Sequence, residues 1–463
     1  MSLIKSISGI RGTIGGFPGA NLTPEDVLKF TAAFGTWVIE TTGNRKIVIG
    51  RDARISGPMV NHIVTGTLLS LGIDVVDLGL STTPTVEMAV QFEKAGGGII
   101  LTASHNPKQW NALKLLNAQG EFISAKAGEE VLRIAENKTM EYADVSSLGS
   151  YSTNETYLEK HIGEILKLDL VKPDAIREKK LKVVIDCVNS TGGIALPKLL
   201  NALGVQQIIE LHTKPDGLFP HNPEPLPENL NELALAVKHH NADLGIAVDP
   251  DVDRLAIVSD DGSMFGEEYT LVAIADYVLK HSPGNTVSNL SSTRALKDIT
   301  EKIGREYFAS AVGEVNVVEL MKEKKAVIGG EGNGGIIYPK LHYGRDAMVG
   351  IALFLSYLSE NHKKTSVLRS TYPNYVIVKR KIDLEQSVNI DRVFELIEEK
   401  YTRFESITID GLKILLDDGD WVHLRKSNTE PIIRIYTESR AENTAENIAN
   451  QFMQEIRFFS NTL

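Results

Sequence analysis

The stretch GGGIILTASHNPKQWNALK, residues 96–114, indicates how this chain folds and where its chemistry lies. Its apolar run GGGII has the composition of a buried strand, and Pro107 prevents regular structure from continuing directly after that run. The turn is expected to leave Ser104 accessible at the end of the strand. A hydroxyl in this place can act as a nucleophile or carry a phosphoryl group, although such a turn also serves purely structural purposes.

Around that stretch, strand-like runs alternate with helical patterns three times. The strand-like runs lie at residues 46–52, 74–79 and 96–103, then at 179–189 and 242–253, and then at 254–262, 285–293 and 324–332. In each set a turn rich in glycine or aspartate follows the last strand, where open α/β sheets usually bind ligands. The pattern predicts three similar α/β domains in succession.

The end of the chain has a different pattern. Residues 376–384, 411–427 and 432–439 have the composition of strands, and residues 442–459 that of a helix. We therefore expect a smaller C-terminal α+β domain after the three repeats.

A second chemical motif is DPDVDR, which follows the apolar run LGIAV. In an extended segment the side chains alternate, so Asp249, Asp251 and Asp253 should converge on one side of the chain. A calcium EF-hand fits poorly, because Arg254 stands where such a loop needs glycine. The cluster predicts a small hard cation such as Mg²⁺, and a solvated acidic loop is the alternative.

The glycine-rich segment GGEGNGG, residues 329–335, contains a match to the dinucleotide pattern G-x-G-x-x-G. The following IIYPK resembles a strand or turn and not a helix, which argues against nucleotide binding. The glycines would let Glu331 and Asn333 project from a tight loop toward a polyol, and a plain hairpin is the alternative.

The segment RKSNTEP, residues 425–431, combines cations, hydroxyls and backbone N–H groups in one turn, with Arg434 beyond it. Such a turn suits a phosphate group, and a solvated basic turn is the alternative.

The composition agrees with a soluble cytoplasmic protein. The 463 residues are too many for one core, and the net charge of −11 argues against nucleic acid as a partner. No signal-peptide core is evident, and the most apolar run, residues 348–358, fits a buried helix, so we expect no membrane partner. The single cysteine, Cys187, excludes an internal disulfide and is expected to be buried.

These segments together resemble the α-D-phosphohexomutase superfamily, whose members interconvert sugar 1-phosphates and 6-phosphates. The resemblance runs from SGIRG at residues 8–12 through TASHNP, DPDVDR and GGEGNGG to RKSNTEP, in the family's order and at its spacing. Further matches are GRDARISG at 50–57, FPHNP at 219–223 and GEVNV at 313–317. The GEGNGG form and the GRD at 344–346 are most similar to phosphoglucosamine mutases and to bifunctional phosphomannomutase/phosphoglucomutases.

The resemblance implies three similar mixed-sheet α/β domains and a smaller α+β domain around a central cleft. The boundaries follow the strand pattern and the family. The expected domains are residues 1–150 with the phosphoserine loop, 151–254 with the metal loop, 255–370 with the sugar loop, and 371–463 with the phosphate loop.

The resemblance also implies the role of each group. Ser104 would carry the phosphoryl group as phosphoserine, and a hexose 1,6-bisphosphate would be both intermediate and activator. Mg²⁺ would be held by Asp249, Asp251, Asp253 and a phosphoserine oxygen at Ser104. The substrate-binding candidates are Glu331 and Asn333 for the sugar, and Arg425, Ser427, Asn428, Thr429 and Arg434 for the phosphate that is not transferred.

Lys114 and Arg11 are the family's candidates for proton handling, with His105 as a further catalytic candidate. Lysine can act if neighbouring cations depress its pKa, whereas arginine more plausibly orients groups or stabilises charge. His105 and His221 are better suited to holding turns. Arg254 joins Arg11, Lys114, Arg425 and Arg434 in the positive cleft that an anionic sugar phosphate requires.

The sequence departs from the family pattern at three positions. Ala112 replaces a frequent glycine, Asn333 a frequent serine and Gly335 a frequent histidine. His342, near Arg345 and Asp346, could supply the missing acid/base group or could be a structural hydrogen-bond partner.

Two other classes of function are alternatives to a mutase. A metal-dependent phosphatase would release inorganic phosphate, and a non-catalytic regulator would only bind the sugar phosphate. The expected substrate is glucosamine phosphate, and mannose or glucose phosphate is the alternative. For the oligomeric state, a monomer and a homodimer are both left open.

Overall fold

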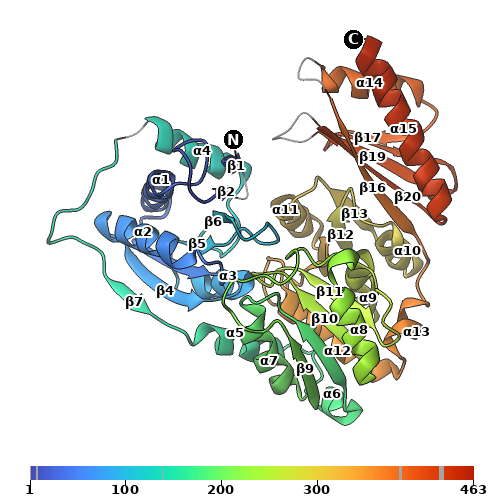
Figure 1. Cartoon of the computed structure of the whole chain (residues 1–463), viewed down its shortest axis with the longest axis horizontal. Helices are drawn as coiled ribbons and strands as arrows, with labels where there is room; N and C mark the ends of the chain where they lie inside the picture. Colours follow the sequence, from blue (N-terminus) through green and yellow to red (C-terminus); the bar gives the residue numbers. More distant parts are fainter. Residues whose placement is uncertain (1, 7–8, 138, 385–387, 427–431, 463) are drawn as a thin grey trace. The chain divides into compact units, whose positions relative to one another are not determined.

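The computed structural model describes residues 2–6, 9–137, 139–384, 388–426 and 432–462 (Figure 1). The described chain forms two compact units. The first contains residues 1–281 and 333–369, and the second contains residues 282–332 and 370–463.

The first sheet of unit 1 has the strand order β1-β2-β6-β5-β3-β4-β7. Its strands are β1 (Ile4–Ser6), β2 (Gly9–Thr13), β3 (Lys46–Arg51), β4 (Asp74–Leu80), β5 (Gly97–Leu101), β6 (Trp110–Leu116) and β7 (Tyr151–Thr153). Strand β3 is parallel to β4 and β5, whereas β6 is antiparallel to β5 and β2, so the sheet is mixed. All residues of β5 are buried, as the run GGGII predicted.

Helices cover this sheet. They are α1 (Pro24–Thr42), α2 (Gly57–Ser70), α3 (Thr83–Phe92) and α4 (Ala125–Asn137). Helix α1 begins with a capping box in which the Thr23 side chain accepts from the Asp26 backbone and the Asp26 side chain accepts from that of Thr23. Apolar side chains of α1 and of the central strands share one core that includes Phe30, Phe34 and Ile99.

The second sheet of unit 1 has the order β11-β10-β8-β9. Its strands are β8 (Lys182–Asp186), β9 (Gln207–Leu211), β10 (Leu244–Val248) and β11 (Leu255–Ser259), and its helices include α7 (Gly192–Leu203) and α8 (Asn231–His240). The sequence pattern placed residues 254–262 in the third set of strands, and this assignment is wrong: β11 pairs antiparallel with β10 across the acidic turn. Cys187 is buried at the end of β8, as expected.

The remaining helices of unit 1 are α5 (Tyr157–Leu166), α6 (Pro173–Lys179), α9 (Glu267–His281), α12 (Ala347–Asn361) and the short α13 (Thr365–Arg369). Helix α12 contains the apolar run predicted to form a buried helix, and its residues from Ala347 to Ser359 are buried. It packs against α6 and α9. Among the described residues, no helix is both long and apolar enough to cross a membrane.

Unit 2 contains parallel β-strands in the order β13-β12-β14. Its strands are β12 (Thr286–Asn289), β13 (Tyr307–Ser310) and β14 (Ile328–Glu331), and its helices are α10 (Ala295–Lys302) and α11 (Glu314–Lys324). The glycine-rich loop that follows β14 leads to the short strand β15 (Gly335–Ile337) and not to a helix, as predicted.

The C-terminal part of unit 2 is an antiparallel sheet in the order β16-β20-β19-β18-β17. Its strands are β16 (Val376–Asp383), β17 (Glu405–Ile407), β18 (Leu412–Leu415), β19 (Trp421–Lys426) and β20 (Ile432–Ser439). Helices α14 (Ile390–Lys400) and α15 (Glu442–Thr462) lie together on one face of it (Figure 1). This confirms the smaller α+β domain, and with the preceding sheets it confirms the predicted fold class of similar α/β domains followed by a smaller one.

Candidate active site

Ser104 lies in the turn after β5, with a φ of 47° in the left-handed region. Its side chain is buried, with 6% of its surface exposed, so the expectation of an accessible serine is wrong for this structure. The reason is a carboxylate that covers it: Ser104 Oγ donates to Asp249 Oδ2 over 2.6 Å. A nucleophile that hydrogen-bonds to a carboxylate is oriented and can pass on its proton.

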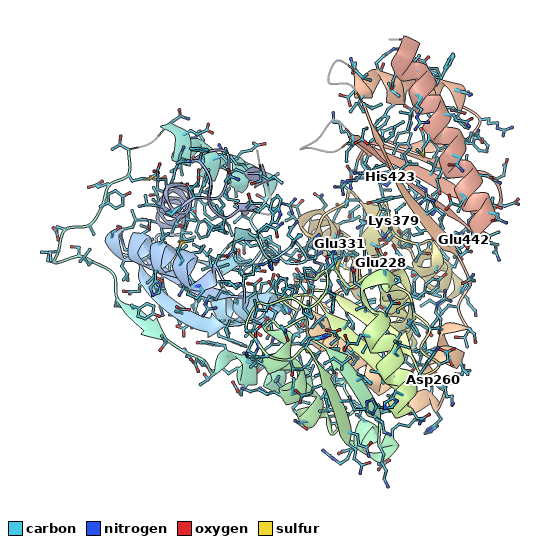
Figure 2. The ribbon with its side chains drawn as sticks, in the orientation of Figure 1. Glu228, Asp260, Glu331, Lys379, His423 and Glu442 are labelled. Atoms are coloured by element: carbon cyan, nitrogen blue, oxygen red, sulfur yellow. The ribbon has the colours of Figure 1, made fainter. Side chains whose placement is uncertain are left out.

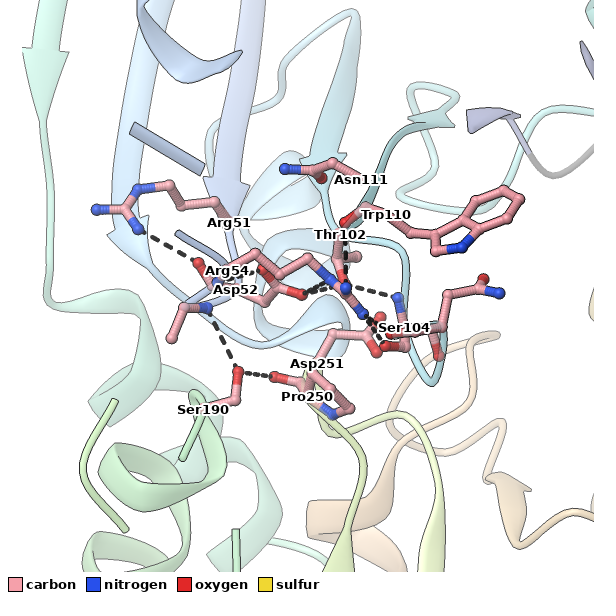
Figure 3. A network of polar contacts seen from close by, with 12 residues as sticks. Arg51, Asp52, Arg54, Thr102, Ser104, Trp110, Asn111, Ser190, Pro250 and Asp251 are labelled. Atoms are coloured by element: carbon pink, nitrogen blue, oxygen red, sulfur yellow. Dashed lines mark hydrogen bonds and ion pairs between the residues drawn. The ribbon is translucent and has the colours of Figure 1, made fainter. Parts of the chain in front are cut away.

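The turn that carries Ser104 is held by the guanidinium group of Arg54 (Figure 3). Arg54 is 1% exposed and donates to backbone carbonyl oxygens of Ser104, Asn106 (2.6 Å), Pro107 (2.7 Å) and Trp110 (3.1 Å). A planar group with several fixed donors fits this set of acceptors, and lysine could not replace it. The motif GRDARISG contains this arginine, but its local sequence does not reveal that role, because the acceptors lie about 50 residues away.

Asp52 orients Arg54 from the same motif. The Nε of Arg54 donates to Asp52 Oδ2 over 2.9 Å, and the hydroxyl of Thr102 donates to the same oxygen over 2.7 Å. Burial raises the pKa of Asp52, and the charge of Arg54 opposes that rise. Because Thr102 also accepts from the Ser104 backbone N–H at 2.9 Å, one connected network fixes the position of the serine.

The three aspartates follow β10 and converge through a turn. Their carboxylate oxygens lie within 4.8 Å of one another, and all three side chains are buried. The convergence was predicted, but its expected cause, an extended chain, is wrong: Val252 has a φ of 63°. A β-branched residue in that region costs about 1–3 kcal/mol, which the surrounding structure must offset.

Cations face the acidic cluster from two other elements. Lys114 on β6 places Nζ 2.7 Å from Asp251 Oδ2 and 3.3 Å from Asp253 Oδ2. Arg345 places Nη2 2.8 Å from Asp253 Oδ2. Thr83, at the start of α3, donates its hydroxyl to Asp251 Oδ2 over 2.6 Å. The cluster is therefore partly neutralised.

Position within the cluster separates the pKa values of its members. Burial, together with the charges of Asp253 and Asp251, holds the pKa of Asp249 well above its usual value. Burial also disfavours the charged form of Asp253, but Arg345 and Lys114 outweigh it and hold its pKa below the usual range. Asp249 is thus suited to accept the Ser104 proton, while Asp253 stays charged.

The acidic cluster also fits a divalent cation. The Oδ1 atoms of Asp251 and Asp253 are buried and have no hydrogen-bond partner among the described residues. A buried carboxylate oxygen without a donor is costly, and a hard cation with oxygen ligands removes that cost. Asp249, Asp251, Asp253 and an oxygen on Ser104 could together hold Mg²⁺.

The pKa of Lys114 is not depressed, as a role in proton handling would require. Burial lowers the pKa of its ammonium group, but Asp251 and Asp253 raise it more, and the net pKa lies above the usual value. Lys114 can therefore act as a base only when another cation takes up the charge of these carboxylates.

Arg345 occupies the space left by the glycine at position 335. A Cβ on Gly335 would lie 2.3 Å from Arg345 Cδ, so a side chain there would displace the arginine. Glycine at position 335, where the family frequently has histidine, thus leaves room for an arginine that contacts Asp253. The departure at Gly335 is visible in the sequence, but its connection with Arg345 appears only in the structure.

Arg11 and His105 are the other two predicted catalytic residues. Arg11 on β2 pairs with Ala112 on β6, so its side chain is on the same face of the sheet as Lys114. The pKa of His105 is held well below its usual value by burial and by the nearby charge of Arg254. His105 is therefore neutral at physiological pH.

His342 belongs to a buried polar network around Asp346. Its Nε2 lies 3.3 Å from Asp346 Oδ2, and its Nδ1 lies 3.4 Å from Glu87 Oε2. The ring of His161 approaches the same Asp346 oxygen at 2.9 Å. Because Asp346 also caps α12 by accepting from the Met348 and Val349 backbones, this geometry favours the structural alternative for His342.

The loop after β14 contributes residues to both units. In unit 1, Asn333 Oδ1 accepts from the Gly335 backbone over 3.2 Å. In unit 2, buried Glu331 accepts from Asn289 Nδ2 over 2.9 Å and from the Gly313 backbone over 3.2 Å.

Arg425 and Arg434 are direct cross-strand neighbours on β19 and β20 of unit 2. Like charges opposite one another destabilise a sheet, so this pair needs an anion. Asp410 partly neutralises the pair, because its Oδ2 lies 2.8 Å from Arg425 Nε. Arg434 is exposed. Ser427, Asn428 and Thr429, the other predicted phosphate ligands, lie outside the described residues.

The sequence matches, in order, the four domain models of one family. They are described as phosphoglucomutase/phosphomannomutase alpha/beta/alpha domain I over residues 3–142, domain II over 155–262, domain III over 266–375, and the C-terminal domain over 375–455.

Individual relatives and a solved structure agree with this match. A phosphoglucomutase/phosphomannomutase of Thermococcus kodakarensis is 35% identical over 94% of this chain and 95% of its own length. A phosphoglucosamine/phosphogalactosamine mutase of Sulfurisphaera tokodaii is 33% identical over 97% and 98%. The crystal structure of a family protein from Burkholderia thailandensis, 27% identical, superposes with a TM-score of 0.84 over 98% of both chains. This chain therefore belongs to the phosphoglucomutase/phosphomannomutase family, within the phosphohexomutase superfamily.

Proposed function

We propose that this protein interconverts hexose 6-phosphate and hexose 1-phosphate through a phosphoserine at Ser104 and a hexose 1,6-bisphosphate intermediate. The observation that carries the proposal is the contact of 2.6 Å between Ser104 Oγ and Asp249, inside a buried acidic cluster with oxygen atoms left for a cation. A serine that only ended a turn would not need a carboxylate partner inside a buried acidic cluster.

The proposed cycle consists of two phosphoryl transfers. In the first, the bond between phosphorus and Ser104 Oγ breaks and a bond from phosphorus to the free sugar hydroxyl oxygen forms. The proton of that hydroxyl passes to a base, and the released Ser104 oxygen takes up a proton. The bisphosphate then reorients. In the second transfer, the bond between the other phosphorus and its sugar oxygen breaks and a bond from that phosphorus to Ser104 Oγ forms. The Ser104 proton passes to a base, and the released sugar oxygen takes up a proton.

Bound Mg²⁺ would neutralise charge on the transferring phosphoryl group. The residues of this chain supply the rest. Asp249 holds the Ser104 oxygen, and Arg54 fixes the turn that carries it. Lys114 approaches both Asp251 and Asp253, so a divalent cation held by these carboxylates would lower the pKa of Lys114 and increase the fraction of neutral amine that can accept a proton.

Arg425 and Arg434, with Ser427, Asn428 and Thr429, bind the phosphate that is not transferred. The like-charged pair supports this assignment, because an anion with several oxygens satisfies both guanidinium groups. Glu331 and Asn333 bind sugar hydroxyls in both orientations of the intermediate.

Glucosamine phosphate is the proposed preferred substrate. A carboxylate such as Glu331 near C2 of the sugar would favour an ammonium group through a charge-assisted hydrogen bond worth about 1.5–3 kcal/mol. The alternative is a phosphomannomutase/phosphoglucomutase of broad specificity, and relatives of both kinds are about equally similar to this chain.

The test is a parallel assay of glucosamine, mannose and glucose 1-phosphates with Mg²⁺ and the matching bisphosphate. We expect 6-phosphate to form without accumulation of inorganic phosphate, with the highest kcat/KM for glucosamine phosphate. Stoichiometric release of inorganic phosphate would identify a phosphatase instead. A preference for mannose phosphate above about tenfold would replace the proposed substrate by the alternative.

A further inference from the structure

A second group of possible metal ligands lies at the end of β8, apart from the three aspartates of the proposed active site. Asp186, His212 and His221 place one ligand atom each within 4.8 Å of one another. His221 Nε2 lies 3.0 Å and His212 Nδ1 lies 3.2 Å from the same oxygen, Asp186 Oδ2. Asp186 is buried, whereas the two imidazoles are each about one-fifth exposed, at 19% and 18%.

The other nitrogen of each imidazole faces a hydrogen-bond acceptor. His221 Nδ1 lies 2.8 Å from the backbone oxygen of Asn222, and His212 Nε2 lies 3.5 Å from Glu232 Oε2. If the inner nitrogens carry protons, they donate to Asp186 Oδ2, and the contact of His221 Nδ1 with the Asn222 oxygen then makes that ring an imidazolium. If instead the outer nitrogens alone carry the protons, the inner nitrogens present lone pairs toward Asp186 Oδ2.

Without a metal ion, the inner nitrogens must carry protons, which makes at least one of two rings whose centroids lie 5.5 Å apart a cation. With a metal ion between the lone pairs and the carboxylate, both imidazoles are neutral and every contact is satisfied. Histidine ligands of metals characteristically donate their outer N–H to a carbonyl or a carboxylate, which fixes the tautomer and the ring. Both histidines have such an acceptor, and Asp186 Oδ1 is fixed by the Val188 backbone N–H at 3.0 Å.

We propose that Asp186, His212 and His221 form a site for a divalent transition metal of the Zn²⁺ class. Two imidazole nitrogens and one carboxylate oxygen are ligands that Zn²⁺ prefers, and Mg²⁺, which prefers oxygen ligands, does not compete effectively there. The partial exposure of both rings leaves room for water as a fourth ligand. His212, with a φ of 52°, adopts a left-handed conformation that directs its ring toward Asp186.

A metal ion bound to His212 and His221 would hold the segment of residues 212–224, the strap, in place. The strap contacts elements that support the proposed active site. The Phe219 ring lies 5.1 Å from the Arg54 guanidinium, and Glu224 Oε1 lies 3.1 Å from Arg254 Nη1. Gly217 packs so closely on Ala53 that a Cβ would lie 2.1 Å from its carbonyl oxygen. The site is therefore structural, and its loss should loosen the strap.

The test is metal binding by the full chain after removal of metal with a chelator, with excess Mg²⁺ present to occupy the three aspartates. Zn²⁺ is titrated in competition with a chromophoric chelator, and Co²⁺ is added for its visible spectrum. The variants are His212→Gln and His221→Gln. The matched control is His239→Gln, on the exposed end of α8, and Asp251→Asn reports on the other acidic cluster.

We expect one equivalent of Zn²⁺ on the wild type, on His239→Gln and on Asp251→Asn. Binding should be at least about a hundredfold weaker in His212→Gln and His221→Gln, because removing a ligand costs no less than removing a partner of a ligand. Co²⁺ should give the intense bands of a four-coordinate site. The absence of a stoichiometric ion on the wild type, or its loss only in Asp251→Asn, would overturn the proposal.

A measurement on the wild type alone covers the case in which a glutamine variant does not fold. ¹⁵N NMR of histidine side chains at pH 7 should show two imidazoles whose inner nitrogens shift on addition of Zn²⁺. Imidazole rings that keep protons on their inner nitrogens and do not respond to Zn²⁺ would establish hydrogen bonds to Asp186 in place of a metal and would exclude the metal site.

Discussion

Each of the three aspartates of the acidic cluster has its own set of partners, although Lys114 is shared by two of them. Asp249 holds the Ser104 hydroxyl, Asp251 faces Lys114 and Thr83, and Asp253 faces Lys114 and Arg345. Because their partners differ, single substitutions at this cluster should have distinct effects. Two predictions concern its members.

Asp251→Asn should abolish Mg²⁺-dependent turnover, because a neutral amide weakens a hard-cation site and leaves phosphoserine charge unbalanced. Initial rates over a range of Mg²⁺ concentrations check this. Asp174→Asn, which changes an exposed aspartate on α6, serves as the control and should behave as wild type. Full activity of the wild type after exhaustive removal of metal would contradict the cation site.

Arg345→Met should tighten the apparent affinity for Mg²⁺ and lower kcat by about tenfold. The methionine keeps the apolar stem beside Gly335 but removes the cation that neutralises Asp253. Mg²⁺ activation curves and saturating rates measure the two effects separately. Arg177→Met removes an exposed cation as a control, and an unchanged Mg²⁺ affinity in Arg345→Met would show that Arg345 does not act on the cluster.

At the scale of elements, the turn after β5 depends on a residue far away in sequence. Arg54 lies 50 residues before Ser104 and holds its carbonyl oxygen as well as three others. Local sequence predicted the strand and the turn because apolar runs and proline act locally. It could not predict the buried state of Ser104, which follows from a carboxylate 145 residues away.

Arg54→Lys should lower kcat by about a hundredfold while leaving the protein folded, because a displacement of the reacting group by about 1 Å has an effect of that size. Lysine keeps the charge but cannot donate to all these carbonyl oxygens. Kinetics and circular dichroism check both parts. Arg51→Lys, which changes a half-buried arginine of the same strand end, should lose much less activity.

His423 on β19 gives a pH-dependent prediction for the C-terminal sheet (Figure 2). Burial, with Lys413 and Arg425 adding to it, lowers the pKa of His423 from 6.5 to about 4. Its nitrogens contact the Ser291 hydroxyl at 3.0 Å and the Asp410 backbone oxygen at 2.7 Å.

Because the pKa of His423 is lower in the folded protein than in the unfolded chain, only the unfolded chain binds a proton on His423 at pH values between the two. The stability from neutral His423 is therefore complete above pH 6.5 and is lost as the pH falls toward 4, by about 3 kcal/mol in total. The Tm of the wild type should fall more steeply over this range than that of His423→Gln. His239→Gln is the control, and parallel pH profiles of wild type and His423→Gln would contradict the assignment.

At the scale of the whole molecule, the repeated strand and helix pattern predicted the fold class because each sheet forms largely from neighbouring segments. It could not predict that residues 333–369 return to the unit of residues 1–281, since that depends on the packing of α12 on α6 and α9. For the same reason Arg345, 92 residues after Asp253, was not predicted as its partner. The domain boundaries near 150, 254 and 370 stay predictions, although β11, which begins just after 254, pairs with β10 of the second sheet.

Phosphorylation of Ser104 is the central claim, and intact-protein mass spectrometry of the enzyme incubated with hexose 1,6-bisphosphate and Mg²⁺ tests it most directly. The wild type should carry one phosphate, located on Ser104 by peptide fragmentation, and should lose it to added hexose phosphate. Ser104→Ala should carry none and should lose at least about a thousandfold in turnover while binding substrate normally. A Ser104→Ala enzyme that retains substantial mutase activity, or a wild type that is never phosphorylated, would contradict the account.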